Sequence, residues 1–154
     1  MENIGGGRVL GLDVGERRIG VAISDPDRRF ALPLHSIDGR DRRAAIDEII
    51  RIATGDEVGE IVVGLPLSLS GAAGAQAETT EAFAKALEER LPLPLHLWDE
   101  RLSTQEAQRR IADEHNPSGR GRRPRARRIE ADTDALAASI ILQAFLDRRR
   151  NTLE

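Results

Sequence analysis

The sequence contains no cysteine, so disulfide bonds, thiolate metal sites and cysteine nucleophiles are excluded. Aromatic residues are scarce, with three Phe, one Trp and no Tyr, so the core must be built from aliphatic side chains. No run of about 18 apolar residues is present, which argues against a membrane span. The first residues also lack the apolar centre of a signal peptide. We therefore expect a protein of the cytoplasm without membrane contact.

The length of 154 residues is that of one domain. Apolar residues make up 40% of the chain and charged residues 32%, and the two kinds are intermixed, which is typical of a folded protein. We expect a single domain over residues 1–154. Its first seven residues end in three glycines and are expected to form a loose tail.

Positive charge is concentrated in one segment. Lys occurs once, and six of nine consecutive residues are Arg120, Arg122, Arg123, Arg125, Arg127 and Arg128. Without these six charges the formal net charge would fall from −3 to −9. Gly and Pro within the segment oppose helix and strand, so we expect a mobile basic loop over 114–128. It is either a solvated linker or an arm that contacts phosphates.

Hydrophobic patterning predicts an alternation of strands and helices. Aliphatic runs predict strands over 8–14, 19–24, 29–37, 60–65 and 94–98. Helical spacing predicts helices over 40–54, 75–90 and 129–149, and the capping box Ser103-Thr-Gln-Glu106 predicts another helix over 103–112. Pro33 indicates that the third strand lies at an edge or carries a bulge.

A three-strand meander followed by α/β units predicts an α/β fold with a five-stranded mixed sheet flanked by helices on both faces. This is the layout of the ribonuclease H-like fold. Each half of the actin-like and sugar-kinase ATPases has the same layout, but those proteins need two halves around a nucleotide and this chain has one.

Two carboxylates occur at the ends of predicted strands. Asp13 lies in an aliphatic strand, where it either caps the turn at Gly15 or serves a ligand for which Gly11 and Gly15 leave space. Glu100 follows the fifth strand, where sites occur in open α/β sheets. A surface pair between Glu100 and Arg101 is the simpler explanation of that residue taken alone.

A third carboxylate, Asp134, begins the apolar stripe of the last helix, which continues through Ala138, Ile141 and Phe145. A carboxylate there needs a partner. Asp132 lies on another face and fits the role of an N-terminal helix Asp. We expect Asp13, Glu100 and Asp134 to converge near the carboxyl edge of the sheet. Their oxygen atoms favour Mg²⁺ or Mn²⁺, as one ion or as a pair about 3.5–4 Å apart that would activate water. Whether Asp25, Asp99 or Asp132 adds a ligand is left open.

Two further segments have structural interpretations. The loop over 64–71 is expected to lie beside the site and position substrate, and Gly71 is expected to adopt a backbone conformation that other residues resist. The run from Arg148 to Arg150 ends the last helix, where cations suit the helix dipole.

Four blocks of the sequence together resemble the YqgF family, also called RuvX, of Holliday junction resolvases and pre-16S ribosomal RNA nucleases. The blocks lie in order at 11–25, 61–71, 99–104 and 134–143. The pattern Asp-Glu-Arg-Leu-Ser-Thr of the third block, together with Val-Gly-Leu-Pro-Leu of the second, is highly specific. The Arg-rich stretch before Asp134 is longer than the resemblance leads one to expect.

The resemblance implies a ribonuclease H-like fold with a catalytic, metal-binding triad that falls on Asp13, Glu100 and Asp134. It also implies nucleic-acid contacts, and we assign these to Arg17, Arg18, Arg101, Ser103 and Thr104 and to the six arginines of the basic loop. The implied activity is that of a nuclease dependent on Mg²⁺ or Mn²⁺ that acts on structured nucleic acid, with processing of the 5′ end of pre-16S ribosomal RNA as the favoured role.

Three alternatives remain. Resolution of branched DNA uses the same chemistry, and a homodimer would favour it because a junction has two-fold symmetry. A non-catalytic nucleic-acid-binding or transcription factor is opposed by the intact triad. An ATP-binding domain of the actin-like kind is opposed by the missing second half. The sequence leaves open RNA against DNA, and monomer against dimer.

Overall fold

The computed structural model describes residues 6–68, 70–103 and 132–153. The chain forms one five-stranded sheet with strand order β3-β2-β1-β4-β5. Pairing is antiparallel between β1 and β2 and between β2 and β3, and parallel between β1 and β4 and between β4 and β5. The bounds of the elements are β1 Arg8–Val14, β2 Arg18–Ser24, β3 Ala31–Asp38, α1 Arg42–Gly55, β4 Val58–Leu65, α2 Ala75–Arg90, β5 Leu95–Asp99 and α4 Thr133–Leu153.

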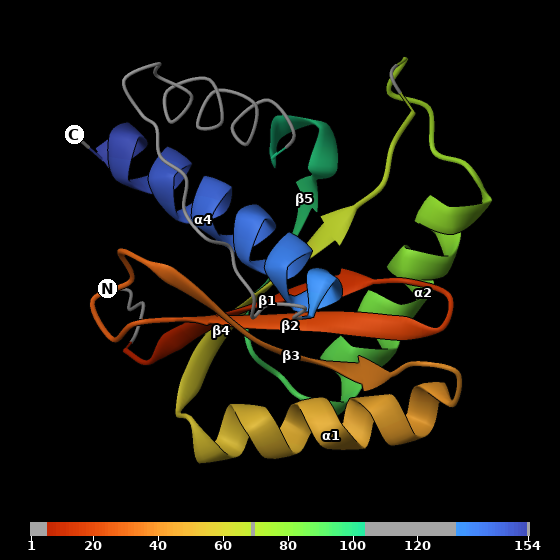
Figure 1. Ribbon diagram of the computed structural model, residues 1–154, viewed down its shortest axis with the longest axis horizontal. Coiled ribbons are helices and arrows are strands. Elements are labelled where there is room, and N and C mark those ends of the chain that lie inside the picture. Colours follow the sequence, from red (N-terminus) through yellow and green to blue (C-terminus); the bar gives the residue numbers. More distant parts are fainter. Residues whose placement is uncertain (1–5, 69, 104–131, 154) are drawn as a thin grey trace, which may run out of the picture.

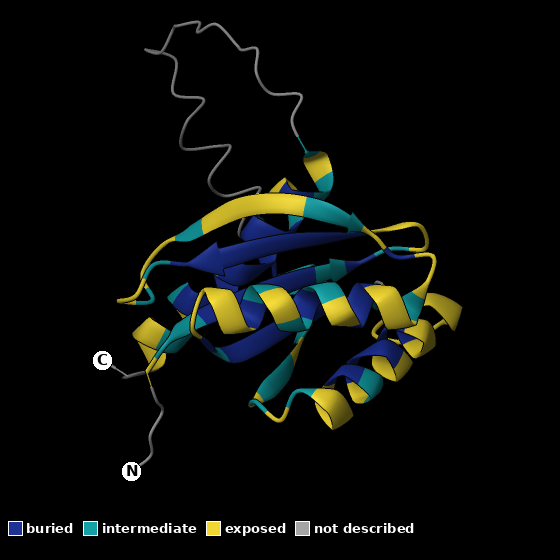
Figure 2. Ribbon diagram, turned by 90° about the horizontal axis from the view of Figure 1, so that it is seen from below, coloured by how far each residue is buried: buried dark blue, intermediate teal, exposed yellow. Residues whose placement is uncertain are grey.

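Helices cover both faces of the sheet, as the patterning predicted (Figure 1). Side chains of α1 and α2 pack on one face against Leu10, Leu12, Ile61 and Val63, all of which are fully buried. On the other face α4 packs against a second cluster that includes Val62. The central strands are therefore buried on both sides, whereas the outer faces of the helices remain exposed (Figure 2). Within the described ranges, no helix has both the length and the apolar content to cross a bilayer.

Local signals account for most element boundaries. Helix α2 spans the predicted 75–90. Helix α1 begins where the Asp41 carboxylate accepts hydrogen bonds from the backbone N–H groups of Arg43 and Ala44. Strand β3 is an edge strand, and its register against β2 shifts so that His35 and Pro33 face consecutive residues of β2. Pro33 thus lies in an edge strand beside a bulge, as expected.

The helix predicted to start at Ser103 begins earlier, which corrects the capping-box interpretation. Residues from Glu100 to Ser103 are already helical. The Asp99 carboxylate accepts the N–H of Arg101 at 3.0 Å, as a helix N-cap does. The Ser103 hydroxyl instead accepts a hydrogen bond from Nε1 of Trp98 at 2.9 Å. The remainder of the predicted helix lies outside the described residues, as do residues 129–131 of the predicted last helix.

A buried carboxylate ties the far end of α4 to the sheet. Glu60 of β4, whose side chain is only 7% exposed, accepts hydrogen bonds from Arg28 at 2.8 Å, from Arg149 at 2.5 Å and from His96 at 2.5 Å. Burial acts to raise the pKa of Glu60, but the hydrogen bonds and charge of Arg149 and His96 outweigh it, so this pKa lies below its ordinary value. Within the run 148–150, Arg149 therefore has a specific partner in addition to the helix dipole.

Replacing Glu60 by Gln should destabilise the protein by about 2 kcal/mol at neutral pH, because it leaves two guanidinium groups without their counter-charge. Since the pKa of Glu60 is lowered on folding, its contribution is present above its unfolded pKa near 4.5 and is lost as the pH falls below that value. Urea unfolding at several pH values measures both effects. The control Glu48→Gln removes an exposed pair with Arg51 and should change little. Equal losses in the two variants would contradict the assigned role of Glu60.

Candidate functional site

The sheet brings Asp13 and Glu100 to the same edge. Asp13 is the penultimate residue of β1, and Glu100 directly follows β5, which runs parallel to β1 with β4 between them. Side chains of alternate residues in a strand share a face. Asp13 thus shares the face of Gly11, which lies against α4, where an added Cβ would be 2.8 Å from Cβ of Leu142.

The carboxyl groups of Asp13 and Glu100 are hydrogen-bonded to each other. Burial is the main cause that raises the pKa of Glu100 to about 7, and the negative charge of Asp13 and its hydrogen bond raise it further. Burial also raises the pKa of Asp13, and the hydrogen bond from Glu100 opposes that change. The hydrogen bond raises the pKa of Glu100 and lowers that of Asp13, so protonated Glu100 is its donor and the Asp13 carboxylate its acceptor. The two groups form a half-buried acidic pair that a cation would neutralise.

This pair should make the stability of the metal-free protein depend on pH. The pKa of Glu100 is about 7 in the folded state and has its ordinary value of 4.5 in the unfolded state, so the folded state binds this proton more tightly. The stabilisation of the fold by protonated Glu100 is thus complete below pH 4.5 and is lost as the pH rises through about 7. Urea unfolding in EDTA should show this decline, and Glu100→Gln should reduce it while Glu48→Gln should not. A decline of the same size in Glu100→Gln would contradict the assignment.

Asp134 lies close to the acidic pair but has a different partner. It occupies the first turn of α4, and its negative charge contributes to the raised pKa of Asp13. Its Oδ2 atom accepts a hydrogen bond from Nε of Arg18 at 2.5 Å. Within the described part of the chain, no three acidic or histidine side chains are arranged to hold a metal ion. The expected triad thus consists of a joined pair and a third carboxylate held by an arginine.

The glycines near the site serve the packing of α4 and the shape of a turn, which corrects the idea that Gly11 and Gly15 clear space for a ligand. A Cβ on Gly11 would meet Leu142, and one on Gly15 would lie 2.8 Å from the carbonyl oxygen of Arg18. Sequence reasoning missed the role of Gly64 in β4, where an added Cβ would be 2.8 Å from Oε2 of Glu100. A glycine within the aliphatic run of that strand was the available signal, because it often marks a close approach.

The other predicted site residues have varied surroundings. Arg101 pairs with Asp99 at 2.5 Å, and its hydrogen bonds are the main cause that lowers the pKa of Asp99. Ser103 is buried and its hydroxyl accepts a hydrogen bond from Trp98, so its expected nucleic-acid contact stays a prediction. Thr104 and the six arginines of the basic loop lie outside the described residues.

Two of the carboxylates considered as further ligands accept hydrogen bonds from backbone N–H groups. Asp25 accepts from the N–H groups of Arg29 and Phe30, both at 2.8 Å. Asp132 accepts from the N–H of Ala135 at 3.1 Å, as expected for the start of α4, and from the N–H of Ser36 at 2.6 Å. Gly71 has a φ of 90°, which confirms that it adopts a conformation other residues resist.

The fold is similar to that of solved RuvC structures. The T. thermophilus RuvC in complex with a Holliday junction substrate aligns with a TM-score of 0.58 and 14% identity, over 94% of this chain and 96% of that chain. A Thermus thermophilus RuvC structure aligns with a TM-score of 0.57 and 14% identity, over 94% and 97% of the two chains. At this identity the likeness concerns the fold alone, which is ribonuclease H-like.

Proteins with more similar sequences share one name. A protein of Chloroflexus aurantiacus is 45% identical over 143 residues, which cover 93% of this chain and 88% of that protein. A protein of Roseiflexus sp. is 44% identical over 94% of this chain and 96% of its own length. One of Thermoanaerobacter pseudethanolicus is 41% identical over 94% and 99%. Each is named "Putative pre-16S rRNA nuclease".

A ribonuclease H-like sheet with paired carboxylates at its edge, together with these relatives, defines the protein as an enzyme of the nuclease class. The family model described as "RuvX: Holliday junction resolvase" matches residues 7–148. The chain belongs to this family, as its four sequence blocks indicated.

Proposed function

We propose that the protein is a divalent-metal-dependent nuclease that hydrolyses phosphodiesters in structured nucleic acid and that processes the 5′ end of pre-16S ribosomal RNA. The observation that carries this proposal is the half-buried, hydrogen-bonded pair of Asp13 and Glu100 beside Asp134. Raised pKa values of neighbouring carboxyl groups are typical of functional sites. The common name of the relatives supports the choice of substrate.

The donor chemistry fits Mg²⁺ or Mn²⁺, because all three side chains offer carboxylate oxygens. Asp13 and Glu100 would hold the ion after losing their shared proton, and Asp134 would complete the set once separated from Arg18. A bound divalent ion supplies Lewis-acid chemistry at a phosphate ester and makes water more acidic. We assign catalysis and metal binding to these three residues.

Hydrolysis adds the oxygen of water to phosphorus, breaks one phosphorus–oxygen ester bond and transfers a water proton to the leaving oxygen. The products are a phosphate monoester and a free hydroxyl group. Gly64 permits Glu100 to approach β4 closely. Arg17 and Arg18 lie in the turn after β1 and at the start of β2, and their charges would bind phosphates of the substrate.

Three parts of the proposal rest on the sequence. The six arginines of the basic loop would act as an arm that contacts phosphates. A substrate in ribosome assembly would place the protein in the cytoplasm. A homodimer would match a substrate with two-fold symmetry, which makes a four-way DNA junction the second candidate substrate.

Cleavage of an end-labelled pre-16S ribosomal RNA leader and of a labelled four-way DNA junction, side by side with Mn²⁺, tests the proposal. We expect cleavage of the RNA, and we expect Mn²⁺ alone to raise the melting temperature by binding the folded state. Cleavage of the junction only would favour the resolvase. Binding of both substrates without cleavage, under either metal, would favour a non-catalytic nucleic-acid-binding protein.

A further inference from the structure

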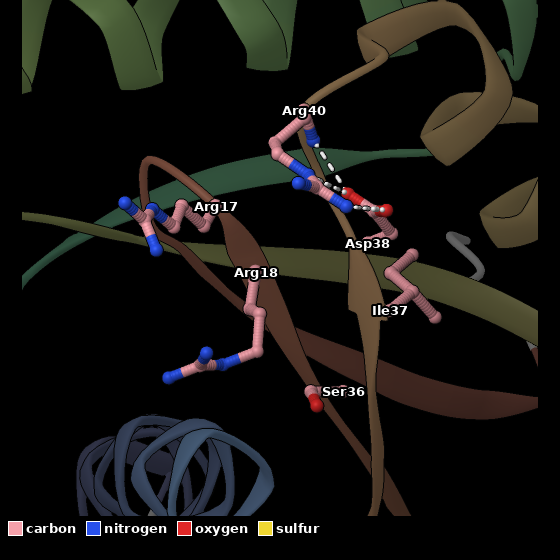
Figure 3. Close-up of a pocket in the computed structure, with 6 residues that line it drawn as sticks. All are labelled: Arg17, Arg18, Ser36, Ile37, Asp38 and Arg40. Atoms are coloured by element: carbon pink, nitrogen blue, oxygen red, sulfur yellow. Dashed lines mark hydrogen bonds and ion pairs between the residues drawn. The ribbon is translucent and has the colours of Figure 1, made fainter.

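The surface hollow beside β2 and β3 is lined by several arginines (Figure 3). It has a volume of about 330 Å³, and we call it the arginine pocket. Three of the lining residues are cationic and one is anionic, so the lining carries net positive charge. The lining residues are Arg17, Arg18, Ser36, Ile37, Asp38 and Arg40.

Two of these arginines keep hydrogen-bond donors available. The side chain of Arg17 is exposed and makes no hydrogen bond or ion pair within the described residues. Arg40 donates from Nε and Nη2 to the carboxylate of Asp38 at 3.1 and 2.8 Å, which leaves its third nitrogen, Nη1, for another acceptor. Planar guanidinium groups suit the oxygens of a phosphate, which can accept two parallel hydrogen bonds.

Arg18 belongs both to this pocket and to the carboxylate site. Its side chain extends from β2 towards α4 (Figure 3). There its Nε atom donates a hydrogen bond to Asp134 at 2.5 Å. The side chain of Arg18 is 60% exposed and that of Asp134 is 30% exposed. An ion pair this open to water is weak, so another anion can replace Asp134 as the partner of Arg18.

We propose that the arginine pocket is a subsite for a backbone phosphate of the substrate, and that an entering phosphate takes Arg18 away from Asp134. The released carboxylate then joins Asp13 and Glu100. This inference rests on the proposed metal site for its consequence but not for the phosphate contact itself.

The exchange of partners couples nucleic acid to metal. A phosphate that withdraws Arg18 removes a positive charge and a competing hydrogen bond from Asp134, so the site binds a divalent cation more tightly. Linkage requires the converse, namely that a bound cation favours Arg18 in the phosphate-bound position. The protein would thus assemble its complete acidic site where substrate is present.

Binding of a short fluorescein-labelled single-stranded RNA in EDTA, followed by anisotropy, tests the pocket without metal. We expect Arg17→Gln and Arg40→Gln each to weaken binding about tenfold and to lower the salt slope by about 0.7, whereas the control Arg51→Gln on α1 should not. Asp38→Asn should strengthen binding, because it frees Arg40. Arg17 and Arg40 variants that match Arg51→Gln in affinity and slope would overturn the phosphate subsite.

The exchange itself is tested by a double-mutant cycle in the same assay. Asp134→Asn should strengthen RNA binding about fivefold because Arg18 loses its competing partner, and this gain should vanish when Arg18→Gln is also present. A gain of equal size with and without Arg18 would mean that Asp134 acts only by general repulsion, and would overturn the exchange.

Mn²⁺ affinity, measured by electron paramagnetic resonance without nucleic acid, separates this inference from the proposed function. Arg18→Gln should bind Mn²⁺ about fivefold more tightly than the wild type, and Arg51→Gln should match the wild type. If Arg18→Gln bound Mn²⁺ with the same affinity as the wild type, the coupling would be overturned, while the metal site itself would stand. No Mn²⁺ binding by any variant would overturn the metal site and with it the coupling, while the RNA experiments would still decide the phosphate subsite.

Discussion

Replacing Asp13 by Asn is expected to lower Mn²⁺-dependent cleavage by at least about 10³-fold while the fold is retained. Asn keeps the volume of Asp but removes the negative charge of one of the two hydrogen-bonded groups that we assign to the metal. Divalent-ion catalysis contributes several kcal/mol of transition-state stabilisation, and each factor of ten in rate corresponds to about 1.4 kcal/mol. Cleavage rates of the labelled RNA leader give the effect directly.

The stability of the metal-free Asp13→Asn variant should not fall with its activity. Burial raises the pKa of Asp13, and the charge of Asp134 adds to this effect, so ionised Asp13 is unfavourable in the metal-free fold. Asp13→Asn should therefore melt at or above the temperature of the wild type in EDTA. Asp47→Asn, which removes an exposed pair with Arg90, is the matched control and should leave both rate and melting temperature unchanged. Full Mn²⁺-dependent activity in Asp13→Asn would exclude the proposed metal site.

Gly20→Ala should destabilise the protein by at least about 3 kcal/mol and should also reduce cleavage. An added Cβ at Gly20 would lie 1.9 Å from the carbonyl oxygen of Asp134 and 2.4 Å from its carbonyl carbon. Both are backbone atoms of the first turn of α4, so the whole helix end must move away from β2. Overpacking costs about 1–3 kcal/mol and occasionally more, because side chains and backbone must shift. A contact of 1.9 Å with a backbone atom places this variant at the upper end of that range or above it.

Urea unfolding measures this loss, and Gly55→Ala is its control. Gly55 ends α1, and nothing lies within 4 Å of the Cβ that alanine would add. That variant should be about 0.5 kcal/mol more stable than the wild type, because alanine reduces the freedom of the unfolded chain. If the two alanine variants had the same stability, the close approach of α4 to β2 would be wrong.

Elements with a strong local pattern could be predicted from the sequence. Helix α2 follows an amphipathic repeat, and β4 follows an aliphatic run that is buried on both faces. The helix after β5 was placed wrongly at Ser103, although its capping box is a genuine local signal. Asp99 supplies the cap earlier, and Trp98 takes the Ser103 hydroxyl. Which of two possible caps is used depends on the surroundings of both.

The carboxylates of the site could also be foreseen, because charged groups beside apolar residues need a reason. The convergence of Asp13 and Glu100 at one edge follows from parallel pairing of β1, β4 and β5. The sequence held no indication that Arg18 would pair with Asp134, since these residues are 116 positions apart. The same holds for the three hydrogen-bond partners of Glu60, a residue that the pattern absorbed into an aliphatic strand.

The sequence by itself determined the periodicity of the strands and helices, the family and the identity of the acidic groups, because each depends on residue types within one segment. The tertiary structure alone decided which glycines admit α4, which carboxylates share a proton and which one pairs with Arg18. These features depend on distances between segments that are remote along the chain. A change of about 1 Å in the docking of α4 would alter the glycine contacts and the Arg18–Asp134 pair without changing any local pattern.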